Sequence, residues 1–251
     1  MGVDTIAGAE PFAATSGHFG VLVLHGFTGS PLSMRPLAER FVDAGFSVEL
    51  PLLAGHGTRV EDLAETRFAD WMDSAFDAHG ELATRTDRTA IVALSMGGLL
   101  ALHLARMLPE IAGLVLINPF VCPPNPSLVE MLEDAVEAGA VFIPGIGGDI
   151  KRSGVMSGGY DSVPIRSMLS LFYAAEAFSE HLEEVTCPVL LLTSREDHVV
   201  PADSGALLEE RIGGAIEHVY LENSYHVATL DNDAGEVEER AIAFVSKLMA
   251  N

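Results

Sequence analysis

The chain has 251 residues, of which 49% are hydrophobic and 20% charged, which suits one large folded domain and excludes a disordered protein. Its 14 basic and 36 acidic residues give a formal net charge of −22, a field that repels nucleic acid and anionic membrane surfaces. No apolar stretch reaches 18 residues without a charge, which argues against stable membrane insertion. Two distant cysteines, Cys122 and Cys187, and an N-terminus without the features of a secretory signal predict a cytoplasmic protein.

Short apolar runs alternate with helical patterns along the chain. "VLVLH" (21–25) predicts a buried strand, "SPLSMRPLAERFVDAG" (30–45) a helix, and "FSVELP" (46–51) a second strand. The same reasoning predicts helices at 68–82, 96–108 and 235–249 and strands at 90–94, 113–118, 188–193 and 216–221. Because strands alternate with helices, we expect an α/β fold with a mostly parallel central sheet and helices on both faces.

One segment, residues 120–184, interrupts this alternation. It contains Pro-rich "PFVCPPNP" and Gly-rich "IPGIGGD" and "SGGYDSVP", with helical stretches at 128–139 and 165–182 and no predicted strand. The segment lies between two predicted strands, so we expect a small insertion above the sheet. Residues 1–119 and 185–251 would then form the core.

A serine lies between the predicted strand 90–94 and the helix that follows it, in "ALSMGG" (93–98). A nucleophile on so tight a turn needs small residues two positions before and after it, here Ala93 and Gly97. The usual pattern is G-x-S-x-G, and Ala93 departs from it by one methyl group. Alone, the motif leaves open whether Ser95 is a structural serine or a nucleophile.

A serine nucleophile requires a base, and the base requires a carboxylate that orients it. Asp197 follows the predicted strand 188–193, and His226 follows the last one. The order Ser95, Asp197, His226 is that of an α/β-hydrolase, with Glu196 as the rival acid. A metal site built from the strand-end histidines His25, His56 and His226 is a weaker alternative, because their spacing matches no metal motif.

Acyl transfer also needs hydrogen-bond donors for the oxyanion that forms. The amide of Met96, at the start of a helix, is one candidate. The second is the amide of Phe27 in "HGFTGS" (25–30), where Gly26 and Gly29 allow the loop to turn toward the serine.

The motifs "VLVLHGFTGSPLSMRPLAERFVDAGFSVELPLLAGHGT", "LSMGG", "REDHVVP" and "NSYHVATLD" resemble those of bacterial monoacylglycerol lipases and carboxylesterases of the α/β-hydrolase superfamily. The resemblance extends from about residue 20 to the C-terminus and is weakest across 120–184. It implies a serine esterase without a cofactor, with Ser95, Asp197 and His226 as triad and the amides of Phe27 and Met96 as oxyanion donors. It further implies that 120–184 is a cap that shapes an acyl pocket.

The predicted cap also carries the expected substrate contacts. Apolar Val141, Phe142, Ile143 and Ile146 suit a fatty chain or plain packing. Monoacylglycerol lipases of this type carry an acidic residue shortly before a tyrosine that matches Tyr160. Here Ser157 takes that position and Asp161 follows the tyrosine.

We therefore expect hydrolysis of a lipid ester, a monoacylglycerol of medium-to-long chain, to fatty acid and glycerol. The alternatives are a carboxylesterase that prefers short simple esters and, outside enzymes, a non-catalytic hydrolase-like binding protein. Whether the chain acts as a homodimer stays open.

Overall fold

A central seven-stranded sheet organises the computed structural model, which describes residues 5–145, 148–201 and 203–250. The strand order is β1-β3-β2-β4-β5-β8-β9, and every neighbouring pair is parallel except β1 with β3. The strands are β1 (Phe12–Ala14), β2 (Phe19–Leu24), β3 (Ser47–Leu50), β4 (Arg88–Leu94), β5 (Leu114–Ile117), β8 (Val189–Ser194) and β9 (Ile216–Leu221). The expected mostly parallel α/β sheet is confirmed.

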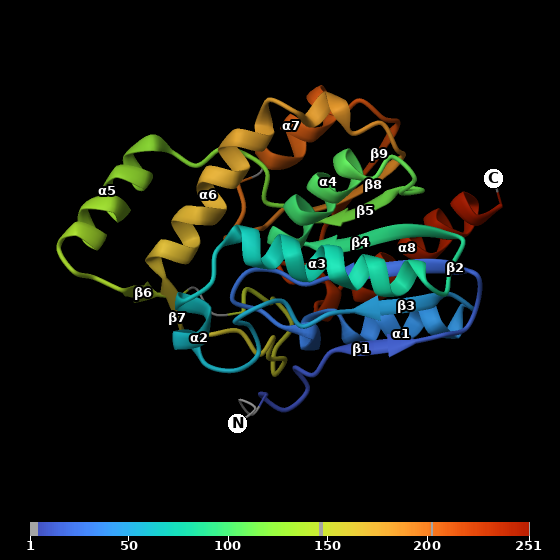
Figure 1. Ribbon diagram of the computed structural model, residues 1–251, viewed down its shortest axis with the longest axis horizontal. Helices are drawn as coiled ribbons and strands as arrows, with labels where there is room; N and C mark the ends of the chain where they lie inside the picture. The colour runs from blue at the N-terminus through green and yellow to red at the C-terminus, as the bar shows by residue number, and fades with distance from the viewer. Residues whose placement is uncertain (1–4, 146–147, 202, 251) are drawn as a thin grey trace.

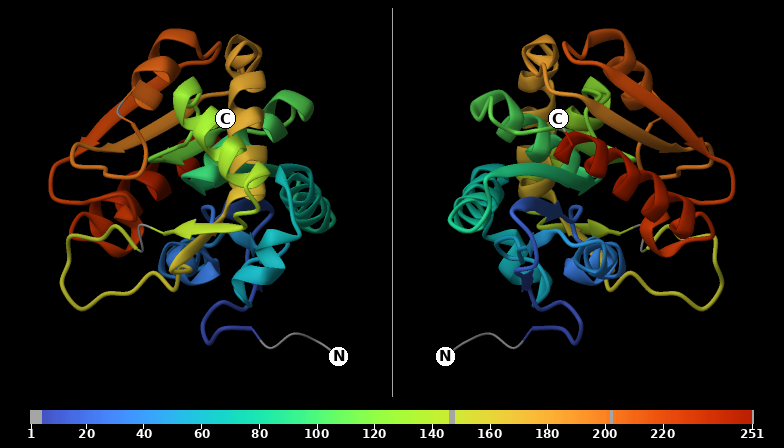
Figure 2. Two further views of the ribbon diagram at one scale, coloured as in Figure 1. Left: turned by 90° about the vertical axis from the view of Figure 1, so that its left-hand side faces the viewer. Right: turned by 90° about the vertical axis from the view of Figure 1, so that its right-hand side faces the viewer.

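Helices cover both faces of this sheet (Figures 1 and 2). They are α1 (Arg35–Asp43), α2 (Val60–Ala64), α3 (Phe68–Ala83), α4 (Met96–Met107), α5 (Pro126–Glu137), α6 (Ile165–Ser179), α7 (Asp203–Arg211) and α8 (Ala234–Met249). In Figure 1, α3 lies in front of the sheet and α8 passes behind it. The central strands alternate their buried side chains between these layers. In β2, for example, Leu22 and Leu24 pack with α3 and α4, whereas Val21 and Val23 pack with α1 and α8.

The 120–184 segment contains α5, β6 (Phe142–Pro144), β7 (Ser162–Pro164) and α6. The prediction of no strand in this segment is wrong, because β6 and β7 pair antiparallel. Each has three residues and includes a proline, so neither shows the alternating pattern of a longer strand. Figure 1 shows α5 and the β6–β7 pair beyond one end of the sheet, while α6 runs back against α3 and α4. A small apolar cluster of Leu132, Ile165, Leu169 and Phe172 joins α5 to α6.

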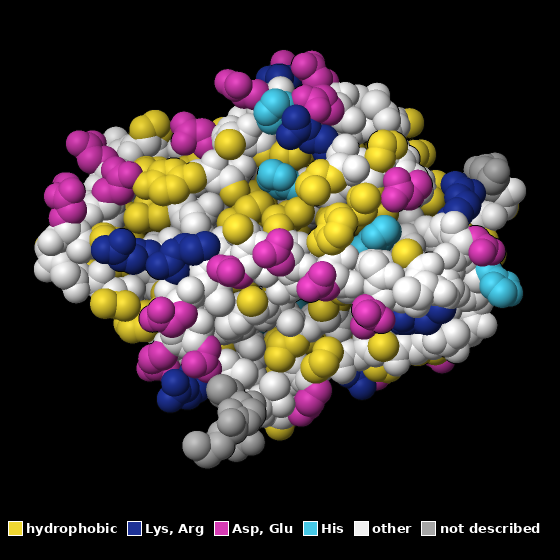
Figure 3. Space-filling view, in the orientation of Figure 1, with side chains coloured by type: hydrophobic (Ala, Val, Ile, Leu, Met, Phe, Trp, Pro, Cys, Tyr) yellow, Lys and Arg dark blue, Asp and Glu magenta, His cyan; other side chains and the backbone are white. Residues whose placement is uncertain are grey.

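Acidic side chains are distributed over the face shown in Figure 3, above both the core and α5. The excess of negative charge is therefore spread over that face. Among the helices of the described ranges, none is both long and apolar enough to cross a bilayer.

Candidate active site

Ser95 lies on a sharp turn at the carboxyl edge of the sheet. It follows the last residue of β4 and precedes Met96, the first residue of α4, with φ 57° and ψ −122°. A positive φ is costly for any residue with a Cβ, so the surrounding structure must impose it. Two hydrogen bonds of the Ser95 backbone hold the turn in place. The Ser95 amide donates to the carbonyl of Ile117 at 3.0 Å, and the Ser95 carbonyl accepts from the Phe120 amide at 3.1 Å. The serine side chain lines a cavity at this edge.

The helix after Ser95 crosses β2 so closely that only glycine fits at position 97. A Cβ on Gly97 would come 2.7 Å from the carbonyl oxygen of Leu24 and 2.8 Å from that of His25. These are backbone atoms, so the clash cannot be relieved by rotating a side chain. The pattern small-x-Ser-x-Gly thus follows from the packing of α4 on the sheet.

We expect Gly97→Ala to destabilise the fold by roughly 2–3 kcal/mol, because the added methyl group forces strand and helix apart. Gly80→Ala is the matched control: Gly80 lies in α3 and a Cβ there meets nothing within 4 Å. Alanine at that position should stabilise the helix by about 0.5–1 kcal/mol. Urea unfolding of both variants measures the difference. Equal stabilities would contradict the close crossing of α4 and β2.

Asp197 and His226 meet at the same edge. The Nδ1 atom of His226 lies 2.7 Å from Oδ2 of Asp197, and both side chains are more than nine-tenths buried. The other carboxylate oxygen, Oδ1, accepts from the amides of Val199 and Val200, each at 2.8 Å. The rival acid Glu196 points elsewhere, to Nζ of Lys151 at 2.9 Å, and is exposed. Because Nδ1 of His226 is bonded to Asp197, only its Nε2 is left to accept a proton. His226 and Ser95 line the same cavity.

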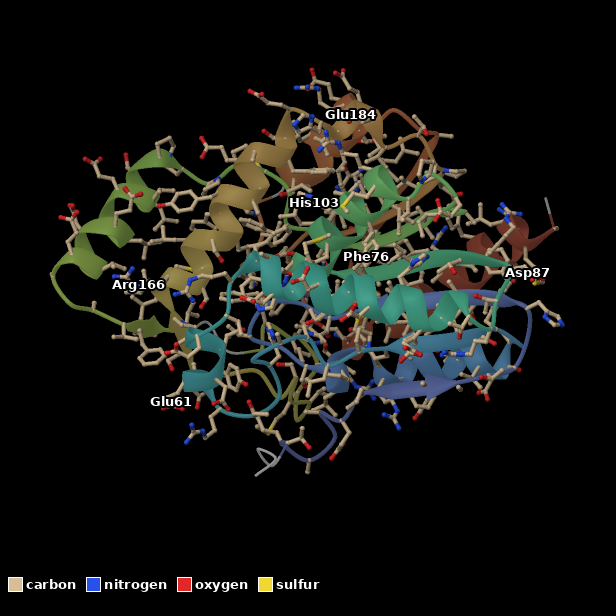
Figure 4. All side chains as sticks on the ribbon, viewed as in Figure 1. Glu61, Phe76, Asp87, His103, Arg166 and Glu184 are labelled. Atoms are coloured by element: carbon tan, nitrogen blue, oxygen red, sulfur yellow. The ribbon has the colours of Figure 1, made fainter. Side chains whose placement is uncertain are left out.

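The other predicted strand-end histidines do not join this group. His25 and His56 lie edge to face, with ring centroids 5.0 Å apart, in an aromatic cluster with Phe27 and Trp71. His103, labelled in Figure 4, lies on α4, with its ring against those of Phe68 and Phe178. Within the described ranges, no three His, Cys, Asp or Glu side chains form a group that could hold a metal ion.

Burial lowers the pKa of His25 to about 4 and that of His56 to about 3, the latter with a contribution from His25. Both imidazoles are neutral in the folded protein at pH 7, whereas in the unfolded chain they protonate near pH 6.5. The unfolded state therefore binds more protons between pH 6.5 and 4. Over that window we expect the free energy of unfolding to fall by up to about 1.4 kcal/mol per pH unit for each histidine.

Replacing His56 with phenylalanine removes one of these titrations and keeps an aromatic ring in the cluster. Urea unfolding at several pH values between 6.5 and 4 should therefore show a shallower loss of stability in His56→Phe than in the wild type. A pH dependence that is unchanged in the variant would show that His56 does not titrate as its burial requires.

Phe27 and Met96, the predicted amide donors, lie in the two segments next to Ser95: Met96 follows it in the chain, and Phe27 follows Gly26 in the neighbouring loop. The loop that carries Phe27 passes close to the serine, since a Cβ on Gly26 would come 3.1 Å from the Ser95 Cβ. Thr28, the next residue, has φ 60°, a strained value for a β-branched side chain. Its carbonyl accepts from the Tyr160 amide at 3.2 Å, which fixes the loop from the 120–184 segment. Neither the Phe27 nor the Met96 amide has a hydrogen-bond acceptor among the described residues, and Phe27 lines the cavity with Ser95.

The cavity that Ser95 and His226 line has a volume of about 340 Å³, within the usual range for small-molecule sites. Its wall is mostly apolar and comes in about equal parts from the 120–184 segment and from the rest of the chain, with Phe120 and Phe172 stacked at 5.6 Å. The remaining apolar side chains of the lining are Phe27, Leu94, Leu128, Ile143, Val163, Met168, Leu171, Val199, Val200 and Val227. Two larger hollows, of about 570 and 670 Å³, lie elsewhere and include neither Ser95 nor His226.

The predicted substrate contacts separate in the structure. Ile143 and Ser157 line the cavity. Val141 is 55% exposed, and Phe142 is not part of the cavity wall. Asp161 is exposed and also lies outside the wall, where its carbonyl accepts from the Gly145 amide. Ile146 lies outside the described residues.

Asn118 is a site residue that sequence reasoning treated only as the end of a strand. It directly follows β5 with φ 44° and is buried. Its Nδ2 donates to the carbonyl of His226 at 2.7 Å and to Oγ of Ser194 at 2.9 Å, and its Oδ1 accepts from the Ser194 amide at 2.7 Å. Asparagine tolerates the left-handed backbone region better than most residues. Asn118 thus ties the His226 loop to the ends of β5 and β8.

Three features together define a class of protein. They are a serine on a strained strand-to-helix turn, a buried Asp–His pair at the ends of later strands, and the mostly parallel sheet that carries them. The model of the alpha/beta hydrolase family matches residues 21–240, and the chain belongs to that family. Within it, the chain is a relative of bacterial monoacylglycerol lipases and carboxylesterases. It is 41% identical over 250 residues to a thermostable monoacylglycerol lipase of Bacillus sp. (strain H-257), covering 96% of each chain. It is 25% identical to a carboxylesterase of Bacillus subtilis (strain 168), covering 95% of this chain and 97% of that protein.

Solved structures agree on the fold. A structure described under "LipS and LipT, two metagenome-derived lipolytic enzymes" superposes with a TM-score of 0.92 at 42% identity, covering 97% of this chain and all of that one. A monoacylglycerol lipase of Paleococcus ferrophilus superposes with a TM-score of 0.76 at 19% identity, covering 95% of this chain and 99% of that one. At 19% identity the second likeness shows the fold alone.

Proposed function

We propose that the chain hydrolyses monoacylglycerols of medium-to-long acyl chain to fatty acid and glycerol, through an acyl-enzyme on Ser95. Carboxylic ester hydrolysis is the activity common to the names of the two relatives above. The observation that carries the proposal is one cavity whose wall combines Ser95 and His226 with a largely apolar lining. The supporting pair, Asp197 and His226, lies within hydrogen-bond distance and is shielded from water.

The first step forms the acyl-enzyme. His226 accepts the Ser95 proton at Nε2 while Oγ attacks the ester carbonyl carbon. Asp197, at Nδ1, keeps the imidazole in the tautomer that can accept this proton and stabilises the imidazolium that results. His226 then gives the proton to the departing glycerol oxygen. In the second step the same base takes a proton from water, which releases the fatty acid and restores Ser95.

The amides of Phe27 and Met96 stabilise the oxyanion in both steps. Both lack an acceptor among the described residues, and Met96 begins α4, a twelve-residue helix whose dipole favours negative charge at that end. Backbone hydrogen bonds at Thr28 and Ser95 hold these two strained residues, and with them the loop and the turn, in one arrangement before substrate binds. Removing one such donor typically costs roughly 10²–10³ in kcat.

The 120–184 segment acts in this proposal as the cap that shapes the acyl pocket. Phe120, Leu128 and Phe172 from the segment face the cavity together with core residues. Ser157 is buried in the cavity wall, and its hydroxyl is suited to a glycerol hydroxyl. Two free cysteines, Cys122 and Cys187, support a reducing and hence cytoplasmic location.

A carboxylesterase that prefers short simple esters is the second candidate. The observation that favours it is that the described residues lining the cavity include no Asp or Glu that could bind the glycerol hydroxyls. Such an enzyme would use the same serine, base and amides. The two candidates differ in the acyl-chain length that the enzyme would prefer and in whether it would recognise a glycerol head group.

Initial rates on 1-monoacylglycerols and matched p-nitrophenyl esters, from butanoyl to hexadecanoyl, test the proposal, with Ser95→Ala as background. Each methylene group buried in an apolar pocket is worth about 0.8 kcal/mol, or about fourfold in kcat/KM. We expect kcat/KM to rise with chain length until the pocket is filled, and monoacylglycerols to be cleaved. A maximum at the shortest esters would replace the proposal by the carboxylesterase, and no hydrolysis of either series would overturn both.

A further inference from the structure

A second carboxylate reaches the loop of the base from the 120–184 segment. Oδ2 of Asp149 accepts hydrogen bonds from the backbone amides of His226 and His198, each at 3.1 Å. Its Oδ1 lies 2.9 Å from Nδ1 of His198. The side chain is only 9% exposed, so these bonds form with little competition from water. Asp149 is therefore engaged with the main chain of His226 and with the loop of Asp197.

Residues 149–152 lie as a strap across these two loops. The carbonyl of Asp149 accepts from the Val227 amide at 3.1 Å. The amides of Lys151 and Arg152 donate to Asp231 at 2.7 and 2.8 Å, and Nζ of Lys151 pairs with Glu196. The strap is thus tied to the core at points that do not involve the Asp149 side chain. Loss of that side chain alone should leave the strap in place.

We propose that Asp149 is a positioning residue that fixes the backbone of His226 for proton transfer, an inference that rests on the proposed ester hydrolysis. His226 is held at three points. Asp197 binds its imidazole, Asn118 binds its carbonyl, and Asp149 binds its amide. The contact with Asp197 sets the orientation of the ring, and the other two fix the backbone position from which the ring extends. A misplacement of about 1 Å in such a constellation can cost on the order of 10² in rate.

The charge of Asp149 adds an electrostatic effect. The charged or titratable groups around it are Asp197, His198 and His226 from the two loops. The strap itself carries Lys151 and Arg152, whose partners are Glu196 and Asp231. A negative charge beside the base favours the imidazolium form. Alanine at this position removes both this charge and the contact with the His226 amide. The pH profile then distinguishes positioning of the base from support of the strap.

The experiment compares Asp149→Ala with Glu196→Gln in the full chain, on a p-nitrophenyl ester that the wild type hydrolyses. Glu196→Gln removes the Lys151 pair of the same strap and does not touch His226. We expect Asp149→Ala, which removes the acceptor of the His226 amide, to lower kcat about 10–100-fold with KM within about twofold, and to move the acid limb of kcat/KM to lower pH. The rate of fluorophosphonate labelling of Ser95 should fall in parallel. Glu196→Gln should match the wild type in kcat, KM, the acid limb and the labelling rate. His198→Asn leaves the bond between Asp149 and the His226 amide in place, so its kcat should fall less than threefold.

Thermal unfolding separates this outcome from a loss of fold, and Asp149→Ser serves the same comparison if the alanine variant does not fold. A folded Asp149 variant with unchanged kcat and an unchanged acid limb overturns the positioning role, and so does a loss equal to that of Glu196→Gln. Absence of hydrolysis and of labelling in the wild type would instead overturn the proposed function. The two failures are therefore distinguishable.

Discussion

Replacing Ser95 with alanine is expected to lower kcat by roughly 10⁴–10⁶ on any ester that the protein hydrolyses. Without Oγ no acyl-enzyme forms, and only the oxyanion amides and substrate binding remain to assist water. Serine and alanine are both disfavoured at φ 57°, and the turn is fixed through the backbone of Ser95, so stability should change by less than about 1 kcal/mol. Initial rates, together with urea unfolding, measure both effects.

Ser33 provides the matched control for that experiment. It also lines the cavity, but its hydroxyl is already engaged with the carbonyl of Ser30 at 2.9 Å. Ser33→Ala should retain activity within a few-fold. Full activity in Ser95→Ala, or an equal loss in both variants, would contradict the assignment of Ser95 as the nucleophile.

Asp197→Asn is expected to lower kcat by about 10⁴ with little change in structure. The Oδ1 of asparagine can still accept from the amides of Val199 and Val200, so the loop should keep its shape. Its Nδ2, however, donates to Nδ1 of His226 and favours the tautomer with the proton on Nε2. That tautomer cannot accept a proton from Ser95.

Glu196→Gln is the paired substitution, since Glu196 precedes Asp197 on the same loop and faces Lys151. The structure predicts wild-type kcat for this variant. Steady-state kinetics on one ester compares the two. A large loss of kcat in Glu196→Gln together with near-normal kcat in Asp197→Asn would show that Glu196, and not Asp197, orients the base.

The elements that the sequence predicted well are those with a long and regular pattern. The strand 216–221 matches β9, and the helix 68–82 lies within α3. The elements that were missed are short, namely β1, β6, β7 and α2, together with α7. A three-residue edge strand such as "FAA" in β1 offers no periodicity, and its place is decided by pairing with β3.

The site divides in a similar way. Ser95, Asp197 and His226 were predicted as one site because each follows a predicted strand, and parallel strands bring their carboxyl ends to one edge. Asn118 and Asp149 were not assigned to the site, because their contacts with His226 span 108 and 77 residues of chain. Asp149 lies in a Gly-rich stretch whose path only the folded structure defines. Nothing local to either residue signals such a contact.

Covalent labelling with a long-chain alkyl fluorophosphonate, followed by intact mass and peptide mapping, tests the central claim most directly. Such a reagent needs both an activated serine and an apolar pocket that accepts its chain. The structure predicts one adduct per chain, on Ser95, formed faster with long-chain than with short-chain reagents and abolished in Ser95→Ala. An adduct on Ser33 or Ser157, the other serines of the cavity wall, or no adduct at all would contradict the account.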